Sequence, residues 1–202
     1  TLPEGRMKSR EGTVVDADDL MDELSNMVAI EITKRHTKIS KTELSNLKEK
    51  IALAALKCYL LKFSSNTDIT FNPKESISLE GETGPYLQYS LVRARKILEK
   101  SKLNLKKINF DLLNKPEEIA LIKLLQNFPL TIEKSTSSYS PHTLVEYCFK
   151  LSSTFNHFYE TCHVLNASKN EIKVARLNLV KAYSIIMQSS LSLLSIESVD
   201  LM

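Results

Sequence analysis

Apolar residues recur at helical spacing along most of the chain, and their pattern predicts where helices lie. The first such segment covers residues 18–36, with acidic residues in its first turn and basic residues in its last, as the helix dipole favours. Its expected apolar stripe consists of Leu20, Leu24, Met27 and the pair Ala29–Ile30. A second helix is expected over residues 44–63, which are nearly all apolar from Ile51 to Leu61 and are therefore predicted to be buried.

Proline marks the start of most of the later helices. At the first helical position proline loses nothing, because its missing N–H would have no partner inside the helix. The prolines with this role are Pro73, Pro85, Pro116 and Pro141. The predicted helices cover residues 73–79, 85–101, 116–127, 141–165 and 171–194. A short strand is expected over residues 68–71, and a β-like run closes the first fifteen residues.

The last two predicted helices are long and strongly periodic. The apolar stripe of the first is Leu144, Tyr147, Cys148, Leu151, Phe155, Phe158, Tyr159 and Cys162, and that of the second is Ile172, Ala175, Leu179, Ala182, Ile186 and Leu193. Such stripes are buried when helices pack side by side. The sequence therefore predicts a mainly all-α fold. A helical bundle is expected over residues 84–202, after a smaller α-rich region over residues 1–83 with a short strand or two.

The composition is that of a soluble globular protein and argues against several classes. Hydrophobic residues make up 43% and charged residues 25% of the 202 residues, and there are only 4 glycines and 6 prolines. The cysteines Cys58, Cys148 and Cys162 are far apart and form no CxxC pair, which argues against a disulfide framework or a zinc knuckle. No apolar run reaches the length of a membrane helix. A reducing, cytoplasmic setting is expected.

The net charge of +3 is mild but unevenly distributed. Residues 88–115 include eight basic and two acidic side chains, whereas five of each cancel over residues 141–202. Arg93, Lys96 and Lys100 lie at positions i, i+3 and i+7 and form a basic helix face. This asymmetry favours a polyanion lying over the first bundle helix, with the neutral helices recognising something more specific than charge.

Two other site chemistries find little support in the sequence. His157, Cys162 and His163 are close along the chain, but positions 157 and 162 align poorly on a helix. No further ligand lies at metal-site spacing, so no metal site is predicted. The paired acids Asp18–Asp19 and Glu117–Glu118 stand at helix starts, where favourable interaction with the helix dipole explains them.

Three blocks of sequence resemble the arginyl-tRNA synthetases. They are GRMKSREGTVVDADDLMDEL, FNPKESISLEGETGPYLQYSLVRAR, and the stretch from FNHFYETCHVLNA to the final SIESVDLM. Their order and spacing resemble the C-terminal part of that family from residue 5 to the last residue. The resemblance implies a class I aminoacyl-tRNA synthetase that joins arginine to its tRNA using ATP, with an anticodon-binding domain of the DALR type.

The opening loop resembles the KMSKS-type loop, which closes over the phosphates of ATP. The resemblance assigns this role to Arg6, Met7, Lys8, Ser9 and Arg10, with Mg²⁺ accompanying ATP in the whole enzyme. Mobile cations stabilise the charge that grows on the phosphates in the transition state. The family often has Lys-Met-Ser-x-Arg, and the different order here leaves the role of Lys8 open. On this motif alone, a solvated basic loop is an equal alternative.

The middle block is expected to open the anticodon-binding domain. Gly81 and Gly84 would permit backbone conformations closed to other residues. The predicted tRNA contacts are to phosphates for Arg93, Lys96 and Lys100, and near the anticodon for Asn156, Tyr159 and Met202. Tyr86 or Gln88 is expected to meet tRNA or to brace the domain junction. Half-buried packing is an equal alternative for Tyr86 and Tyr89.

The nucleotide-binding fold of these synthetases would lie upstream, and the chain contains no His-x-Gly-His string. We therefore expect that the chain alone does not activate arginine. The expected partners are tRNA specific for arginine and, in the whole enzyme, arginine and ATP. A monomer without membrane association is expected. The alternative is a helical protein-interaction module derived from such a domain, without catalysis.

Overall fold

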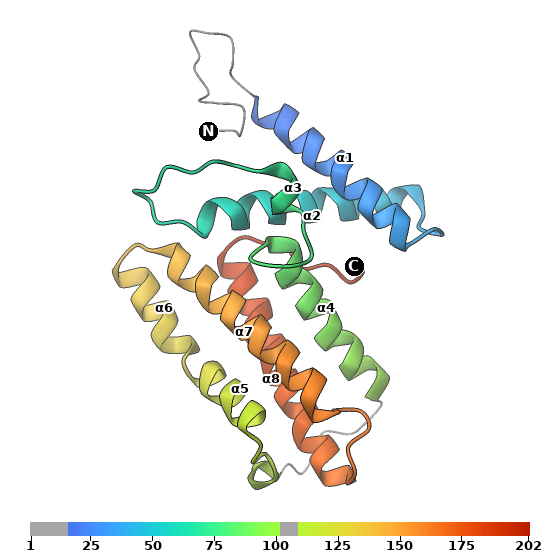
Figure 1. Cartoon of the computed structure of the whole chain (residues 1–202), viewed down its shortest axis with the longest axis vertical. Coiled ribbons are helices and arrows are strands. Elements are labelled where there is room, and N and C mark those ends of the chain that lie inside the picture. The colour runs from blue at the N-terminus through green and yellow to red at the C-terminus, as the bar shows by residue number, and fades with distance from the viewer. Residues whose placement is uncertain (1–15, 102–108) are drawn as a thin grey trace.

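The computed structural model describes residues 16–101 and 109–202, and its regular structure is helical (Figure 1). The helices are α1 (Ala17–Arg35), α2 (Lys41–Leu61), α3 (Pro73–Ser76), α4 (Gly84–Ser101), α5 (Pro116–Gln126), α6 (Phe128–Ser137), α7 (Pro141–Cys162) and α8 (Asn170–Leu193), with a 3₁₀ helix at Phe110–Leu112. The predicted mainly all-α fold is confirmed. Within the described ranges, no helix combines the length and apolar character that a bilayer-spanning segment needs.

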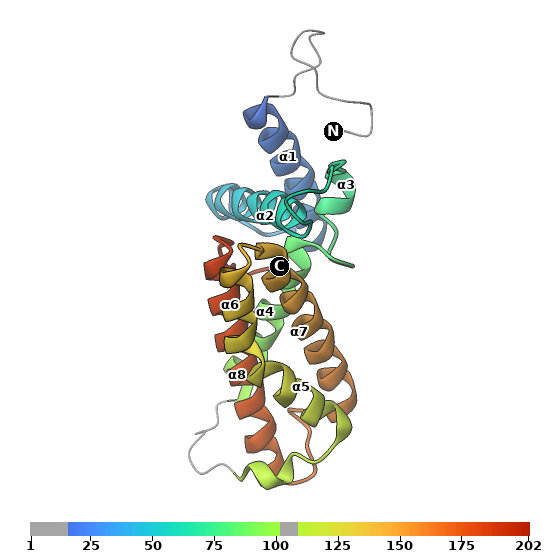
Figure 2. The ribbon, with the colours of Figure 1, turned by 90° about the vertical axis from the view of Figure 1, so that its left-hand side faces the viewer.

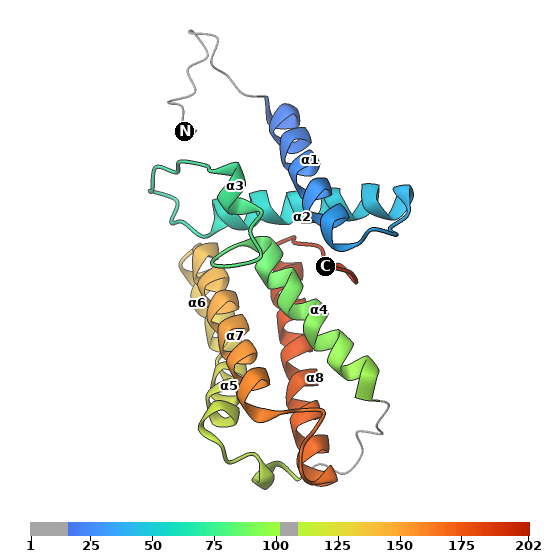
Figure 3. The same ribbon diagram turned by 45° about the vertical axis from the view of Figure 1, so that its right-hand side comes forward.

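The helices form an elongated bundle with a crossing helix at one end. Helices α4, α7 and α8 run along the bundle, α5 and α6 line one side, and α2 lies across its upper end (Figures 1 and 2). Helices α1 and α3 pack on α2. Helix α8 finishes at this end, and the chain after it runs between α2 and α4, as Figure 3 shows in dark red.

Two hydrophobic clusters hold this arrangement together. The bundle cluster is built around the fully buried Phe155, Phe158 and Tyr183, and the rings of Phe155 and Tyr183 stack at 3.9 Å between centroids. The α1–α2 cluster contains Leu24, Val28, Ile32, Leu47, Ile51, Ala52, Tyr59, Phe71, Val92 and Val199. Helix α2 belongs to both, because it also sends Ala54 and Cys58 into the bundle cluster. Helix α2 therefore packs between the two cores.

The strand expected over residues 68–71 is wrong, and no strand occurs elsewhere in residues 16–101 and 109–202. Phe71 is buried edge-on against the Tyr59 ring at 4.9 Å between centroids. The Tyr59 hydroxyl donates a hydrogen bond to the main-chain oxygen of Thr70 at 2.9 Å. These two contacts with Tyr59 hold the segment against α2. The β-like run before residue 16 lies outside the described residues.

Helix α6 was not expected from the sequence, and two predicted helices are too long. The β-branched and hydroxyl side chains of α6 have modest helix propensity. Phe128 and Ile132 pack on the bundle cluster and supply the missing stabilisation. Helix α3 ends at Ser76 instead of residue 79. Helix α7 ends at Cys162 instead of residue 165, because His163 adopts the left-handed conformation with φ 42°.

Two of the predicted apolar stripes each include one exposed residue. Ile30 and Leu193 are 57% and 60% exposed, whereas the predicted α7 stripe is buried apart from the half-buried Tyr159. The buried face of α8 includes Val180, Tyr183, Met187 and Leu191. Helix α8 is apolar around much of its circumference, so periodicity alone cannot choose its buried face. The hydroxyl of Tyr183 can be buried because Ser90 and Ser152 lie 2.7 and 3.3 Å from it.

The entry into α4 depends on three small residues. The Thr83 hydroxyl accepts a hydrogen bond from the Tyr86 N–H at 3.1 Å and so caps the helix. Gly81 has φ +79°, the left-handed region that glycine adopts without strain. Gly84 has a different role from the one expected, because a Cβ there would overlap the main-chain carbonyl of Ala54 on α2. Its lack of a side chain lets α4 start directly against the α2 backbone.

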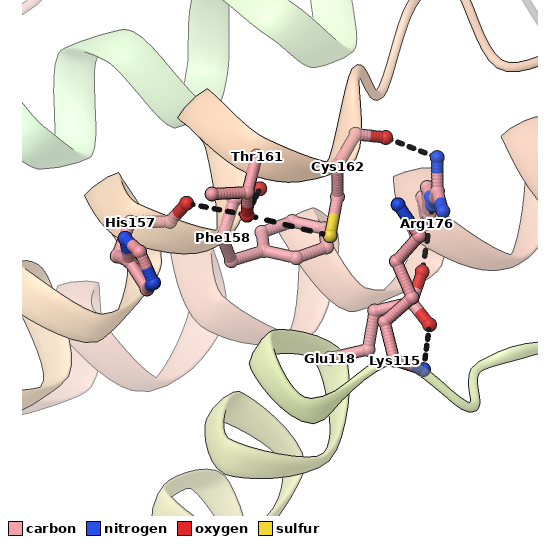
Figure 4. A network of polar contacts seen from close by, with 7 residues as sticks. All are labelled: Lys115, Glu118, His157, Phe158, Thr161, Cys162 and Arg176. Carbon is pink, nitrogen blue, oxygen red and sulfur yellow. Dashed lines mark hydrogen bonds and ion pairs between the residues drawn. The ribbon is translucent and has the colours of Figure 1, made fainter.

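A buried ion pair joins α5, α7 and α8 at the end of the bundle remote from α2 (Figures 1 and 4). Arg176 Nε lies 2.7 Å from Glu118 Oε1, and Glu118 also accepts a hydrogen bond from the Lys115 N–H at 2.9 Å. The Arg176 guanidinium donates to the carbonyl of Cys162 at the C-terminus of α7. One arginine thus satisfies a helix end and neutralises a fully buried carboxylate.

Candidate nucleic-acid interface

Five half-buried side chains of α4 and α7 form a connected group, named here the α4–α7 cluster. Its members are Tyr86, Tyr89 and Arg93 from α4 and Asn156 and Tyr159 from α7. Arg93 donates hydrogen bonds to Asn156 Oδ1 at 3.0 Å and to the Tyr89 hydroxyl at 2.9 Å. Asn156 Nδ2 donates to the Tyr86 hydroxyl at 3.0 Å. The guanidinium carbon of Arg93 lies 4.9 and 5.8 Å from the ring centroids of Tyr89 and Tyr159.

Helical spacing places these residues at the border between core and solvent. Positions 86, 89 and 93 follow one another by three and four residues, so they share one face of α4. On α7 the neighbouring Phe155 and Phe158 are fully buried, which leaves Asn156 and Tyr159 beside the buried stripe. Packing of α4 on α7 then brings the two faces together.

The cluster has the chemistry of a site for unpaired bases. Single-stranded bases are held by stacking on aromatic rings or guanidinium planes and by hydrogen bonds to their edges. Three tyrosines and one arginine supply such surfaces. An amide oxygen can accept two hydrogen bonds and an amide nitrogen can donate two, so half of the capacity of Asn156 remains for another group.

A basic face continues along α4 from the cluster. Lys96 and Lys100 are exposed at positions three and seven residues after Arg93. Exposed lysines on successive turns are typical contacts for a phosphate backbone. Arg95, which lies in the same basic stretch of sequence, is instead hydrogen-bonded to the segment after α8.

Gln88 links α4 to α2 and to the segment after α8. Its side chain is fully buried, and Nε2 donates to the main-chain oxygen of Glu197 at 2.7 Å and lies 3.5 Å from that of Lys50. Its Oε1 is buried with no hydrogen-bond partner. Of the two roles expected for Tyr86 or Gln88, bracing the junction is the one that fits the burial of Gln88.

Met202 lies apart from the α4–α7 cluster. It packs against the α1–α2 cluster and lines a cleft of about 510 Å³ together with Met27 and Ile77. A second cleft of about 510 Å³ opens beside Tyr86. The two clefts share Leu79 and Glu80 as lining residues, so the loop before α4 separates Met202 from Tyr86.

The His157, Cys162 and His163 group does not converge on one point. Cys162 is fully buried, whereas His157 and His163 are exposed, and His163 ends α7. Among the residues described, no three His, Cys, Asp or Glu side chains lie together as a metal site would require. Burial raises the pKa of the Cys162 thiol above its usual value, which makes it a poor nucleophile and metal ligand at neutral pH.

The structure unites four of the predicted tRNA contacts and leaves the others apart. Tyr86, Arg93, Asn156 and Tyr159 share the cluster, Lys96 and Lys100 adjoin it, and Gln88 and Met202 lie elsewhere. The loop predicted to contact ATP, residues 6–10, falls outside the described residues. Tyr89 was not among the predicted tRNA contacts, and half-buried packing was an equal alternative for it. Its spacing of four residues from Arg93 on one helix could have identified it as an arginine-stacking partner.

Comparison with known proteins places most of this geometry in a known domain family. Residues 87–202, which include most of the cluster, match the DALR anticodon binding domain. The arginine–tRNA ligase of Treponema denticola is 38% identical over 100% of this chain, which spans 35% of that protein. The ligase of Borrelia hermsii is 39% identical over 96% of this chain and is matched over 34% of its own length.

Solved structures show the same relationship in three dimensions. Thermus thermophilus arginyl-tRNA synthetase superimposes on 100% of this chain with a TM-score of 0.90 and 26% identity, and the match covers 34% of that structure. The Plasmodium falciparum enzyme matches 94% of this chain with a TM-score of 0.84 and 28% identity. The chain thus spans about a third of the length of the relatives it matches. It belongs to the family defined by the DALR anticodon binding domain, and its whole length is similar to part of an arginine–tRNA ligase.

Proposed function

We propose that the chain is the tRNA-binding part of an arginine–tRNA ligase and that it binds the anticodon arm. The observation that carries this proposal is the α4–α7 cluster, in which Arg93 lies over two tyrosine rings and is bonded to Asn156. Its position in a domain of the anticodon-binding family supports the proposal.

Two parts of the surface would act on the RNA in different ways. Lys96 and Lys100 would neutralise phosphates, which provides affinity without sequence preference. Tyr86, Tyr89, Arg93, Asn156 and Tyr159 would stack on and hydrogen-bond to unpaired bases, which provides discrimination. Arg93 would take part in the base site and not only in phosphate binding, because its guanidinium already lies over two rings.

The whole protein would ligate arginine to its tRNA with ATP, in the presence of Mg²⁺. Arg6, Lys8 and Arg10 would then neutralise ATP phosphates. The domain boundary at residue 84, the monomeric state, the cytoplasmic location and the inactivity of the isolated chain remain predictions. A salt titration of RNA binding tests the proposed function directly.

Binding of a tRNA specific for arginine should weaken steeply as salt concentration rises. If about four to six phosphates are neutralised, a plot of log affinity against log salt has a slope of about −4 to −5. Replacing Lys96 or Lys100 by alanine should make the slope shallower by about one each, because each lysine releases about one counterion. Lys181→Ala on α8, a lysine outside the proposed surface, is the matched control. A flat salt response would contradict tRNA binding and would favour a protein-interaction module.

A further inference from the structure

The segment after α8 is held in place although it contains no helix. Residues 194–202 are called the C-terminal strap here. Helix α8 ends in a Schellman turn, in which the Ser195 N–H donates to Ser192 O at 3.0 Å and the Ile196 N–H donates to Leu191 O at 2.8 Å. Ser195 takes the left-handed position with φ 55°. The turn directs the strap back across α2 and α4 (Figure 3).

Side chains of two helices bind the main chain of the strap. Alternate carbonyls accept hydrogen bonds, Ser195 O from Lys57 Nζ at 2.5 Å, Glu197 O from Gln88 Nε2 at 2.7 Å and Val199 O from Arg95 Nη1 at 3.3 Å. Between them, Ile196 is buried in the bundle cluster and Val199 in the α1–α2 cluster. The strap therefore connects both cores.

Arg95 makes the largest number of these contacts. Besides Val199 O, its guanidinium donates to Gln188 Oε1 on α8 at 2.5 Å, Ser198 Oγ at 3.1 Å and Asp200 Oδ1 at 3.0 Å. The Asp200 side chain is 97% exposed, so this ion pair adds little. The planar fork of arginine can serve several acceptors at once, which the single ammonium of lysine cannot do with the same geometry.

The strap ends at a cleft that it lines together with the loop before α4. Met202 lines its cleft with Ile77, Leu79 and Glu80. Leu79 and Glu80 also line the cleft beside Tyr86. The strap that Arg95 holds and the Tyr86 side chain thus border two clefts that the same loop, Leu79–Glu80, lines.

We propose that Arg95 is a positioning residue for RNA recognition. It holds the strap, the strap fixes the loop before α4, and the loop sets the position of Tyr86 in the α4–α7 cluster. Its guanidinium is committed to protein acceptors and is not a phosphate contact. This inference rests on the proposed function of the cluster.

The test combines hydrogen exchange of the strap with RNA binding by the full chain. Arg95→Met keeps the apolar stem and removes every donor. Without the hydrogen bonds from the charged group, exchange at strap amides should accelerate about tenfold or more while α7 and α8 keep their protection. Discrimination between anticodon stem-loops with arginine and non-arginine anticodons should fall about tenfold. The salt slope should stay unchanged.

Two further variants separate positioning from general stability. Arg95→Lys should restore part of the strap protection and part of the discrimination. Asp200→Asn should behave like the unchanged chain, because its ion pair is exposed. If Arg95→Met also accelerates hydrogen exchange in α7 and α8, Arg95→Lys replaces it as the variant that is compared with the unchanged chain.

Several results would overturn the proposal. Unchanged strap exchange in Arg95→Met would show that Arg95 does not hold the strap. A released strap with intact discrimination would show that the strap does not position the base site. A salt slope shallower by about one would make Arg95 a phosphate contact. If the unchanged chain binds no RNA, the proposed function fails and the positioning role with it, whereas the exchange data still decide whether Arg95 holds the strap.

Discussion

Asn156 and Arg93 form one unit although they lie on different helices. Sequence reasoning assigned Arg93 to phosphates and Asn156 to the anticodon. Arg93 is hydrogen-bonded to Asn156 at 3.0 Å and also contacts Tyr89, so the two residues cannot act on separate parts of the RNA independently. Removing either side chain leaves a half-buried polar partner without its hydrogen bond.

Arg93→Ala and Asn156→Ala should therefore have non-additive effects on RNA binding. In a double-mutant cycle we expect a coupling energy of about 1–2 kcal/mol, because residues in one hydrogen-bonded network are coupled. The measurement is the dissociation constant of an anticodon stem-loop for the four proteins. Lys100→Ala combined with Asn156→Ala is the control pair and should be additive. Additivity within about 0.5 kcal/mol for the first pair would separate the two roles again.

The position of α4 depends on contact between two helix backbones. Gly84 lies so close to the carbonyl of Ala54 that no side chain fits between α4 and α2. Gly81 has open space where a Cβ would lie and needs glycine only for its φ of +79°. The two glycines of the same block thus serve different physical purposes.

Gly84→Ala should destabilise the chain more than Gly81→Ala does. Overpacking against a fixed backbone costs about 1–3 kcal/mol, and the closeness of Ala54 places Gly84 at the upper end of that range. Alanine at a left-handed position costs about 1–2 kcal/mol. Urea denaturation of both variants measures the difference. Equal losses, or a larger loss for Gly81→Ala, would contradict close helix contact as the reason for Gly84.

The Arg176–Glu118 ion pair between α8 and α5 leads to a second prediction about stability. Glu118→Ala should cost about 3–5 kcal/mol, because it leaves Arg176 buried without its counter-ion. The double change Glu118→Leu with Arg176→Met should recover much of that loss, since an apolar pair avoids the cost of desolvating two charges. Denaturant midpoints of both variants test this. A double variant less stable than Glu118→Ala would show that the carbonyl of Cys162 depends mainly on Arg176.

At the scale of the whole molecule, α2 and the C-terminal strap connect the two hydrophobic clusters. Helix α2 contributes side chains to both clusters, and the strap buries Ile196 in one and Val199 in the other. The same packing encloses ionisable groups. Burial raises the pKa of the Cys58 thiol to about 12, and the nearby Cys148 thiol adds to this increase. Burial also raises the pKa of the Cys148 thiol to about 12.

Folding stability should be constant near neutral pH and should fall above about pH 9. The unfolded chain would deprotonate these thiols near their ordinary pKa of 9, whereas the folded chain keeps them protonated up to about pH 12. The stabilisation is therefore complete below pH 9 and is lost as pH rises toward 12, at about 1.4 kcal/mol per pH unit for each thiol. Urea denaturation with reductant at pH 7.5, 9 and 10.5 measures it. Cys148→Ala should reduce the slope, and an unchanged slope would contradict this origin.

The sequence predicted most of the fold from local rules. Proline at the first helical turn located the starts of α3, α5 and α7 and came within one residue of the start of α4. Local rules failed for α6, whose weak propensity is overcome by packing of Phe128 and Ile132, and for residues 68–71, which have the composition of a strand but form none. They also failed for the buried face of α8, where apolar residues surround much of the helix.

For the candidate site, the sequence by itself determined which residues could share a face of one helix. Tyr86, Tyr89 and Arg93 follow helical spacing, and so do Asn156 and Tyr159. Only the tertiary structure decided that the two faces meet, that Gln88 is buried and that Arg95 turns to the strap. Helical periodicity follows from backbone geometry over a few residues. The partners that Arg93 and Arg95 find on other elements lie 63 to 105 residues away and are set by how the helices pack.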